Sequence, residues 1–209
     1  RCVYLGAVDG FLYALDRTSG ARMWQHDCGD WIRSRPHCAG EIVCTATLDG
    51  QVVALRDDGD ACAMLWTAET GRHPIYADLT GDAEGVIATT SDFQTVALDL
   101  RTGEQQWGRS LIRCTYSDGV RAFADSMPDI AQAPVTVAQG RVFFTGRDGF
   151  VIAADALTGK RLWRFESGGR VSAGLTTRDG RVFVGQVGGN QVFYALDSET
   201  GRPLWSRQL

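Results

Sequence analysis

Cysteines and histidines are the residues of this chain best suited to metal or nucleophile chemistry, and all nine lie within the first 114 residues. His26 and Cys28 are two residues apart and His37 precedes Cys38, so a zinc site of thiolates and imidazoles has to be considered. Structural zinc sites usually use cysteine pairs separated by two residues, and no such pair occurs here. We therefore expect no metal and interpret the cysteines as small buried thiols. A disulfide from Cys38 to Cys28 or to Cys44 is the alternative.

Other catalytic patterns are also missing from the sequence. No serine stands in a Gly-x-Ser-x-Gly motif with a histidine to serve as its base. The glycine pairs Gly168-Gly169 and Gly188-Gly189 are followed by no helical pattern, so we interpret them as hairpin glycines rather than phosphate-binding loops. We assign no catalytic residue.

Composition limits the partners further. The 209 residues are 44% hydrophobic and 22% charged, enough for a sizeable core, and the formal net charge is −4. Nucleic-acid-binding domains are usually basic, so we expect no nucleic-acid partner. No apolar run approaches the roughly 20 residues of a membrane-spanning helix, so we expect no transmembrane segment. The chain starts at Arg1 inside a strand-like run, which suggests a piece of a longer protein.

Internal repeats dominate the sequence. Five tryptophans recur at intervals of 41 or 42 residues, with one longer interval of 56. They are Trp24, Trp66, Trp107, Trp163 and Trp205. A unit of about 42 residues is therefore repeated, with one insertion of about 14 residues.

Four of the five tryptophans follow an Asp-x-x-Thr-Gly turn, or a close variant, by four residues. The turn aspartates are Asp16, Asp99, Asp155 and Asp197, and the turn glycines are Gly20, Gly103, Gly159 and Gly201. Asp and Thr side chains can cap the turning backbone. The alanine before Leu-Asp leaves space on the sheet, and we expect the tryptophan to fill that space on the adjoining blade while its indole N–H finds an acceptor.

Short β-prone runs separated by Gly or Asp-Gly turns occur in each unit, without helical periodicity. Four short strands within about 42 residues are typical of a β-propeller blade. In the second unit we predict strand A at 33–38, B at 42–46, C at 52–55 and D at 65–66.

The sequence therefore predicts an all-β protein, a propeller of four-stranded antiparallel blades. About five blades are expected, and the first lacks its innermost strand. We treat residues 1–209 as one propeller region. Its repeats span about 1–30, 31–70, 71–112, 129–168 and 169–209, with the insertion at about 113–128.

The repeat Gly-x-x-Asp-Gly-x-x-Tyr-Ala-Leu-Asp-x-x-Thr-Gly-x-x-x-Trp resembles that of the pyrroloquinoline-quinone-like (PQQ-like) propellers, over nearly the whole chain. This superfamily includes quinoprotein alcohol dehydrogenases, assembly lipoproteins of the bacterial outer membrane, and sensor domains of kinases. The resemblance implies a ring of seven or eight blades, completed by further blades of the same chain. It also implies a bacterial, extracytoplasmic protein, periplasmic or secreted.

Quinoprotein dehydrogenases of this superfamily carry adjacent cysteines, a tryptophan platform and calcium ligands around their cofactor. No adjacent cysteines occur here. We expect a non-catalytic module without a cofactor, acting as a binding or scaffold domain. A fragment of a PQQ-dependent oxidoreductase with calcium is the first alternative, and the sensor domain of a larger enzyme such as a kinase is the second.

Binding residues are expected on the loops that lead from strand D to strand A, because in a propeller these loops and the B–C turns surround the mouth of the central channel. Aromatic and arginine side chains gather there, which suits a protein partner or a small anionic ligand. The candidates are Trp31, Arg33, Arg35, Tyr76, Arg113, Tyr116 and Arg170. Alternatively, Trp31 packs over a blade edge and the arginines pair with turn aspartates.

Overall fold

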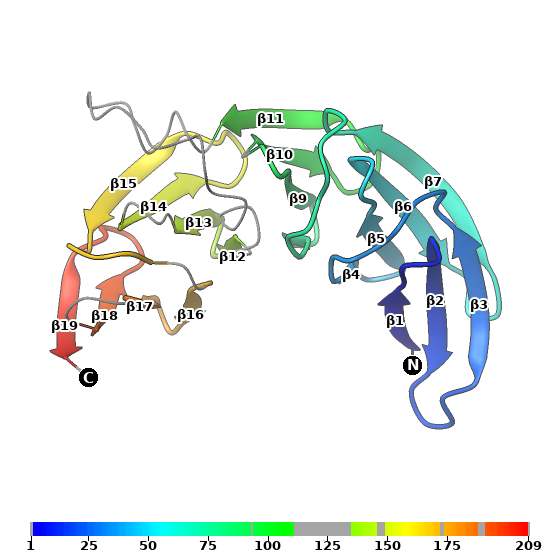
Figure 1. Ribbon diagram of the computed structural model, residues 1–209, viewed down its shortest axis with the longest axis horizontal. Coiled ribbons are helices and arrows are strands. Elements are labelled where there is room, and N and C mark those ends of the chain that lie inside the picture. Colours follow the sequence, from blue (N-terminus) through cyan, green and yellow to red (C-terminus); the bar gives the residue numbers. More distant parts are fainter. Residues whose placement is uncertain are drawn as a thin grey trace.

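The computed structural model describes residues 2–92, 94–110, 135–145, 149–171, 174–187 and 191–208. Five antiparallel sheets follow one another along an arc, with the N-terminus in the first sheet and the C-terminus in the last (Figure 1). We number these sheets blades 1 to 5. Among the described residues, no helix has the length and apolar character needed to cross a bilayer.

The strands are short and evenly distributed. Blade 1 contains β1 (Cys2–Gly6), β2 (Phe11–Asp16) and β3 (Arg22–Asp27). Blade 2 contains β4 (His37–Ala39), β5 (Ile42–Ala46), β6 (Gln51–Asp57) and β7 (Cys62–Glu69). Blade 3 contains β8 (Thr80–Gly81), β9 (Gly85–Thr89), β10 (Gln94–Asp99) and β11 (Gln105–Ser110). Blade 4 contains β12 (Thr136–Ala138), β13 (Arg141–Thr145), β14 (Phe150–Asp155) and β15 (Arg161–Glu166). Blade 5 contains β16 (Thr176–Arg178), β17 (Arg181–Gly185), β18 (Val192–Asp197) and β19 (Pro203–Gln208).

Each blade is a meander in which consecutive strands pair antiparallel, and the four strands of a complete blade correspond to A, B, C and D in chain order. The A strands lie on the inside of the arc and the D strands form its rim (Figure 1). Blade 1 has three strands, corresponding to B, C and D. The predicted all-β propeller architecture is confirmed.

The strand boundaries of the second blade differ from the prediction, since strands C and D are longer than expected and strand A begins later. We expected strand A of the second blade at 33–38, whereas β4 begins at His37. Pro36 has no N–H to donate to a sheet ladder, so it suits the position just before the strand. Residues 31–35 are therefore part of the connection between blades.

The same irregularity occurs in every C–D strand pair. The repeat alanine is the cross-strand partner of the tryptophan in its own blade, as Ala97 is of Trp107, and the register shifts immediately afterwards. The other such pairs are Ala14–Trp24, Ala54–Trp66, Ala153–Trp163 and Ala195–Trp205. We expected the tryptophan to fill space left by an alanine of the adjoining blade, and this was wrong, because the small residue lies opposite the indole within one sheet. The bulge increases the local twist of the rim strand.

Among the described residues, the hydrophobic core forms four clusters, one between each pair of neighbouring blades. Successive residues of a central strand pack in different clusters, because their side chains point to opposite faces of the sheet. In β5, Val43 joins the cluster with blade 1 and Cys44 joins the cluster with blade 3. Both sheet faces are thus buried only where a blade has a neighbour on each side.

Candidate functional site

Three of the D–A connections occupy equivalent places against a B–C turn. The carbonyls of Trp31, Pro74 and Arg170 accept hydrogen bonds from the N–H groups of Leu48, Ser91 and Val187, at 2.9, 2.8 and 2.8 Å. Leu48, Ser91 and Val187 all lie in B–C turns. These three D–A connections and the B–C turns that they contact therefore belong to one face, which we call the loop face. The side chains of Trp31, Pro74 and Arg170 lie at matching positions on it.

The first of these connections presents its side chains alternately. Ile32 and Ser34 are 1% and 4% exposed, whereas Trp31, Arg33 and Arg35 are exposed. Ile32 forms a β-bridge with Thr47, which orients this alternation. In the next connection Ile75 and Ala77 are buried in the same way, between partly exposed neighbours. The apolar residues anchor the loops and leave an indole and two guanidinium groups at the surface.

Carboxylates on the loop face are largely engaged. Arg35 pairs with Asp78 through its backbone N–H at 2.9 Å and its Nε at 3.6 Å. Asp92 accepts a hydrogen bond from Thr90 and lies 3.5 Å from Nε2 of His73. Asp49 accepts a hydrogen bond from the Thr47 hydroxyl in the same way.

Several candidates have unused hydrogen-bonding capacity. Within the ranges that the structure describes, the Arg33 guanidinium and the Tyr76 hydroxyl make no hydrogen bond or ion pair. Trp31 is 53% exposed. Arg113, Tyr116 and the insertion at 113–128 lie outside the described residues.

The repeat tryptophans join neighbouring blades. Each indole N–H of Trp66, Trp107 and Trp163 donates to the carbonyl of the residue after the turn aspartate in the next blade. The acceptors are Leu100 at 3.0 Å, Ala156 at 2.7 Å and Ser198 at 3.0 Å. We call each such contact, from a rim tryptophan to the C–D turn of the following blade, a seam.

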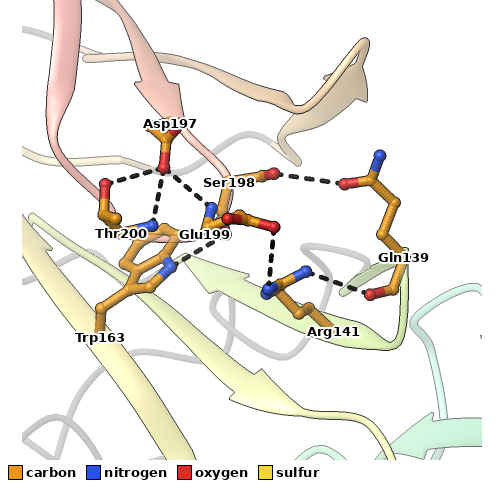
Figure 2. A network of polar contacts seen from close by, with 7 residues as sticks. All are labelled: Gln139, Arg141, Trp163, Asp197, Ser198, Glu199 and Thr200. Atoms are coloured by element: carbon orange, nitrogen blue, oxygen red, sulfur yellow. Dashed lines mark hydrogen bonds and ion pairs between the residues drawn. The ribbon is translucent and has the colours of Figure 1, made fainter.

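Figure 2 shows the seam between blades 4 and 5. Asp197 accepts hydrogen bonds from the N–H and hydroxyl of Thr200, both at 2.8 Å, which orders the turn that Trp163 contacts. Because these bonds, the hydroxyl bond first, favour the ionised carboxylate, they hold the pKa of Asp197 below its ordinary value. Across the seam, Arg141 of blade 4 lies 3.7 Å from Glu199.

Glycine is required in these turns for space as well as for conformation. Gly103, Gly159 and Gly201 have φ of +73°, +66° and +70°. A Cβ on them would lie 2.5 Å from Trp66, 2.8 Å from Trp107 and 2.5 Å from Trp163. The indole of one blade therefore lies directly on the turn glycine of the next.

The seam between blades 1 and 2 is built differently, because the second unit lacks the Asp-x-x-Thr-Gly turn. Trp24 donates instead to the side chain of Asp57, at 2.9 Å. Asp57 also accepts the Tyr4 hydroxyl at 2.5 Å and the N–H of Gly59 at 2.9 Å. Burial alone would raise the pKa of Asp57, but these donors outweigh it and the pKa is lowered. Sequence reasoning missed Tyr4 and Asp57; the altered turn in the second unit was the available signal.

The first and last blades of the arc each carry one side of a seam contact without the other side. Trp205 is 43% exposed, whereas the other four repeat tryptophans are at most 9% exposed. A Cβ on Gly20 would meet no atom within 4 Å, although Gly20 has the same φ as the seam glycines. Blade 5 thus presents an unpaired tryptophan and blade 1 an unpaired turn glycine.

The thiols of the described residues are not joined to one another. Cys2, Cys28, Cys38, Cys44 and Cys62 are free, so the alternative of a Cys28–Cys38 or Cys38–Cys44 disulfide is not found. Cys44 is buried, as expected, and burial raises its pKa to about 12. Cys38 is exposed, contrary to our interpretation, because it lies in the innermost strand of its blade.

A cofactor of the dehydrogenase type needs a cluster of metal ligands. In the described part of the chain, no three His, Cys, Asp or Glu side chains come close enough to hold a metal ion. The turn aspartates are engaged by their own backbones instead, as Asp99 is by the N–H groups of Arg101 and Thr102. Within the described residues, the turn aspartates are therefore held by their own turns rather than gathered into a cation site.

One family model and several curated proteins are similar to this chain in sequence. The family model described as outer membrane protein assembly factor BamB matches residues 8–115 and 119–209. BamB of Yersinia pestis is 26% identical over 212 residues, covering 98% of this chain and 50% of the relative. Quinohemoprotein alcohol dehydrogenase ADH-IIG of Pseudomonas putida is 29% identical over 155 residues, covering 74% of this chain and 16% of that enzyme.

A solved structure agrees with the fold. The crystal structure of BamB from Moraxella catarrhalis aligns with a TM-score of 0.71 at 23% identity, covering 99% of this chain and 61% of that one. The chain spans about half the length of the curated BamB relatives that it matches. With both halves of the repeat array matched by one family model, the chain belongs to the family of outer membrane protein assembly factor BamB.

Proposed function

We propose that this chain is part of a non-catalytic PQQ-like β-propeller that acts as a binding scaffold, and that it recognises a protein partner through its loop face. The relatives named as outer membrane assembly factors support this class of function. They also support a bacterial protein that works outside the cytoplasm, in the periplasm or beyond.

The observation that carries the proposal is the exposed group on the first D–A connection. Trp31 and Arg33 are held outward by the buried Ile32, and the donors of Arg33 are unused within the described residues. Exposed tryptophan and arginine are the residue types most enriched at the centres of protein interfaces. Tyr76, Arg35 and Arg170 extend the same face, and Arg113 and Tyr116 are included on sequence grounds.

We further propose that other blades of the same protein complete the ring. Trp205 and Gly20 support this, since each is one half of a seam whose other half is supplied by a neighbouring blade elsewhere in the arc. A blade with an Asp-x-x-Thr-Gly turn would cover Trp205, and a rim tryptophan would cover Gly20.

Photo-crosslinking in the cells that make the full-length protein tests the loop-face proposal. A photoreactive amino acid replaces Trp31 or Tyr76, and the matched control replaces Arg17, an exposed residue of a C–D turn on the other face. We expect a protein crosslink from the first two positions and none from the third. The absence of any protein crosslink at positions 31 and 76 would refute the proposed function.

A quinoprotein oxidoreductase is the second candidate, favoured by the similarity to the Pseudomonas putida dehydrogenase. Calorimetric titration of the full-length protein with pyrroloquinoline quinone, with and without calcium, separates the two functions. Saturable, calcium-dependent binding would favour the oxidoreductase over the scaffold.

A further inference from the structure

We propose that an apolar patch on the loop face, formed by Val8, Trp31 and Leu48, binds a basic segment of the partner protein. An apolar side chain of that segment packs on Trp31, and its lysine or arginine residues face the surrounding carboxylates. This inference rests on the proposed function and adds the chemistry of the partner.

Two backbone hydrogen bonds place the three residues of the patch in neighbouring segments. The carbonyl of Ala7 accepts the N–H of Ile32 at 3.0 Å, and the carbonyl of Trp31 accepts the N–H of Leu48 at 2.9 Å. Trp31 is therefore held between the B–C turns of blades 1 and 2. Val8 and Leu48 take the same position in these two turns, each of which is closed by a glycine N–H that donates to the residue before the apolar one.

The patch is exposed, and the next connection does not repeat it. Val8 and Trp31 are 56% and 53% exposed, and Leu48 is partly exposed. In the next D–A connection the equivalent contact joins Pro74 to Ser91, so neither position carries a large apolar side chain. Exposed apolar side chains that gather in one place indicate a contact surface, and an indole gives a large contact area at little entropic cost.

Carboxylates outnumber arginines on the surrounding loop face. In blades 1 to 3 the described connections and turns, with the last residue of each D strand that leads into them, comprise 7–10, 27–36, 47–50, 69–79 and 90–92. These residues carry seven carboxylates and three arginines, a formal charge of −4 with histidine neutral. One of the arginines, Arg35, is already paired with Asp78. A face of this charge attracts a basic segment and repels an acidic one.

The patch itself favours a cation. Each of its residues is next to an aspartate in the chain, namely Asp9, Asp30 or Asp49, whereas Arg33 is the one arginine within two positions of it. These carboxylates stay charged when they accept hydrogen bonds, and the bond from the Tyr13 hydroxyl lowers the pKa of Asp9. The face of an exposed indole also attracts lysine and arginine side chains. An apolar segment with basic residues therefore matches both parts of the surface.

Peptide binding to the full-length protein tests the chemistry of the partner. Three end-blocked peptides of equal length are compared by calorimetry: one of arginines and phenylalanines, one with glutamate in place of arginine, and one with alanine in place of phenylalanine. We expect the arginine–phenylalanine peptide to bind about tenfold more tightly than the glutamate peptide and about fivefold more tightly than the alanine peptide. Its affinity should fall as salt is added, because charges at an exposed surface are screened.

Either comparison can overturn the inference. Equal or tighter binding of the glutamate peptide would reject the basic partner. Equal binding of the alanine peptide would reject the apolar patch as the anchor.

Tryptophan variants locate the site. Trp31→Ala should weaken binding of the arginine–phenylalanine peptide about tenfold and abolish its advantage over the alanine peptide. Trp205→Ala is the matched control, since Trp205 is exposed on blade 5 and away from the patch, and should change the affinity less than about twofold. The opposite ranking of the two variants would place binding on blade 5 and reject the patch.

Charge variants test the carboxylates. The double variant Asp30→Asn, Asp49→Asn should lower the preference for arginine over glutamate about fivefold, and asparagine at 49 can still accept the hydrogen bond from the Thr47 hydroxyl. The control is Asp58→Asn, Asp60→Asn, which removes two charges from the C–D turn of blade 2 and should leave the preference unchanged. Equal losses in the two double variants would reject the patch, because only the overall charge of the chain would then matter.

The two proposals fail separately. Protein crosslinks at positions 31 and 76 without discrimination between the peptides would retain the proposed function and reject the basic partner. Absence of those crosslinks would reject the proposed function, whichever peptide binds.

Discussion

The seams at the two ends of the arc bury their tryptophans to a similar extent by different chemistry. Between blades 4 and 5, Trp163 donates to a backbone carbonyl of blade 5 and lies on Gly201, a turn ordered by Asp197. Between blades 1 and 2, Trp24 donates to the Asp57 side chain, which also accepts the Tyr4 hydroxyl. A carbonyl acceptor survives any change of its own side chain, whereas a carboxylate acceptor can be removed by mutation or by acid.

Removing a seam tryptophan should have the largest effect. Trp163→Ala deletes a nearly buried indole and should lower the free energy of unfolding by about 3 to 5 kcal/mol. Trp205→Ala is the matched control, since Trp205 holds the same repeat position without a following blade, and should cost about 1 to 2 kcal/mol. Urea denaturation of the full chain, followed by circular dichroism, measures both. Equal losses would mean that the seam contact contributes nothing beyond packing within the blade.

Alanine substitutions at two turn glycines should distinguish the cost of the clash with an indole from the cost of a positive φ. Gly201→Ala and Gly20→Ala impose the same positive φ on alanine, at a cost of about 1 to 2 kcal/mol. Only Gly201 lies against an indole, so its substitution should cost about 1 to 3 kcal/mol more from overpacking. The difference between the urea midpoints of the two variants measures the effect of the clash with the Trp163 indole. Equal midpoints would show that the indole can move aside.

The carboxylate seam should be sensitive to acid. The pKa of Asp57 is lowered in the folded chain, so the ionised group stabilises the fold above its ordinary pKa of 3.8 and loses this effect as pH falls through its lower folded value. Asp57→Asn should therefore cost about 1 to 2 kcal/mol at pH 7 and progressively less below about pH 4. The exposed Asp58→Asn serves as the control and should follow the parent chain. A destabilisation by Asp57→Asn that is constant from pH 7 to pH 3 would contradict the assigned role.

The smallest effect is expected from one hydroxyl. Tyr4→Phe removes a donor to Asp57 and keeps the ring, which should cost about 1 kcal/mol, because Trp24 and the N–H of Gly59 still satisfy the carboxylate. Tyr13 makes a similar hydrogen bond to Asp9 at the exposed surface, so Tyr13→Phe should have no measurable effect. A larger loss in the Tyr13 variant than in the Tyr4 variant would reverse our ranking of the two bonds.

The repeat pattern is sufficient to predict the architecture of the blades. Residues equivalent to Trp107, Gly103 and Asp99 recur at fixed positions because each performs a task, packing, turning or capping, which is the same in the units that carry the Asp-x-x-Thr-Gly turn or its close variant. The exposed position of Trp31 could also be anticipated, since it is the one tryptophan outside the repeat register. Requirements of this kind involve residues that are close together in the sequence, so the sequence pattern reveals them.

Contacts between blades were decided by the tertiary structure. Nothing in the sequence around Trp24 indicates that its acceptor is a side chain 33 residues further along, or that Tyr4 shares that acceptor. The pairing of Arg35 with Asp78 across two connections is equally remote in sequence. Composition, turns and strand order thus follow from the sequence by itself, because they depend on neighbouring residues. Which donors meet which carboxylates, and which remain available for a partner, depends on how the blades pack against one another in space.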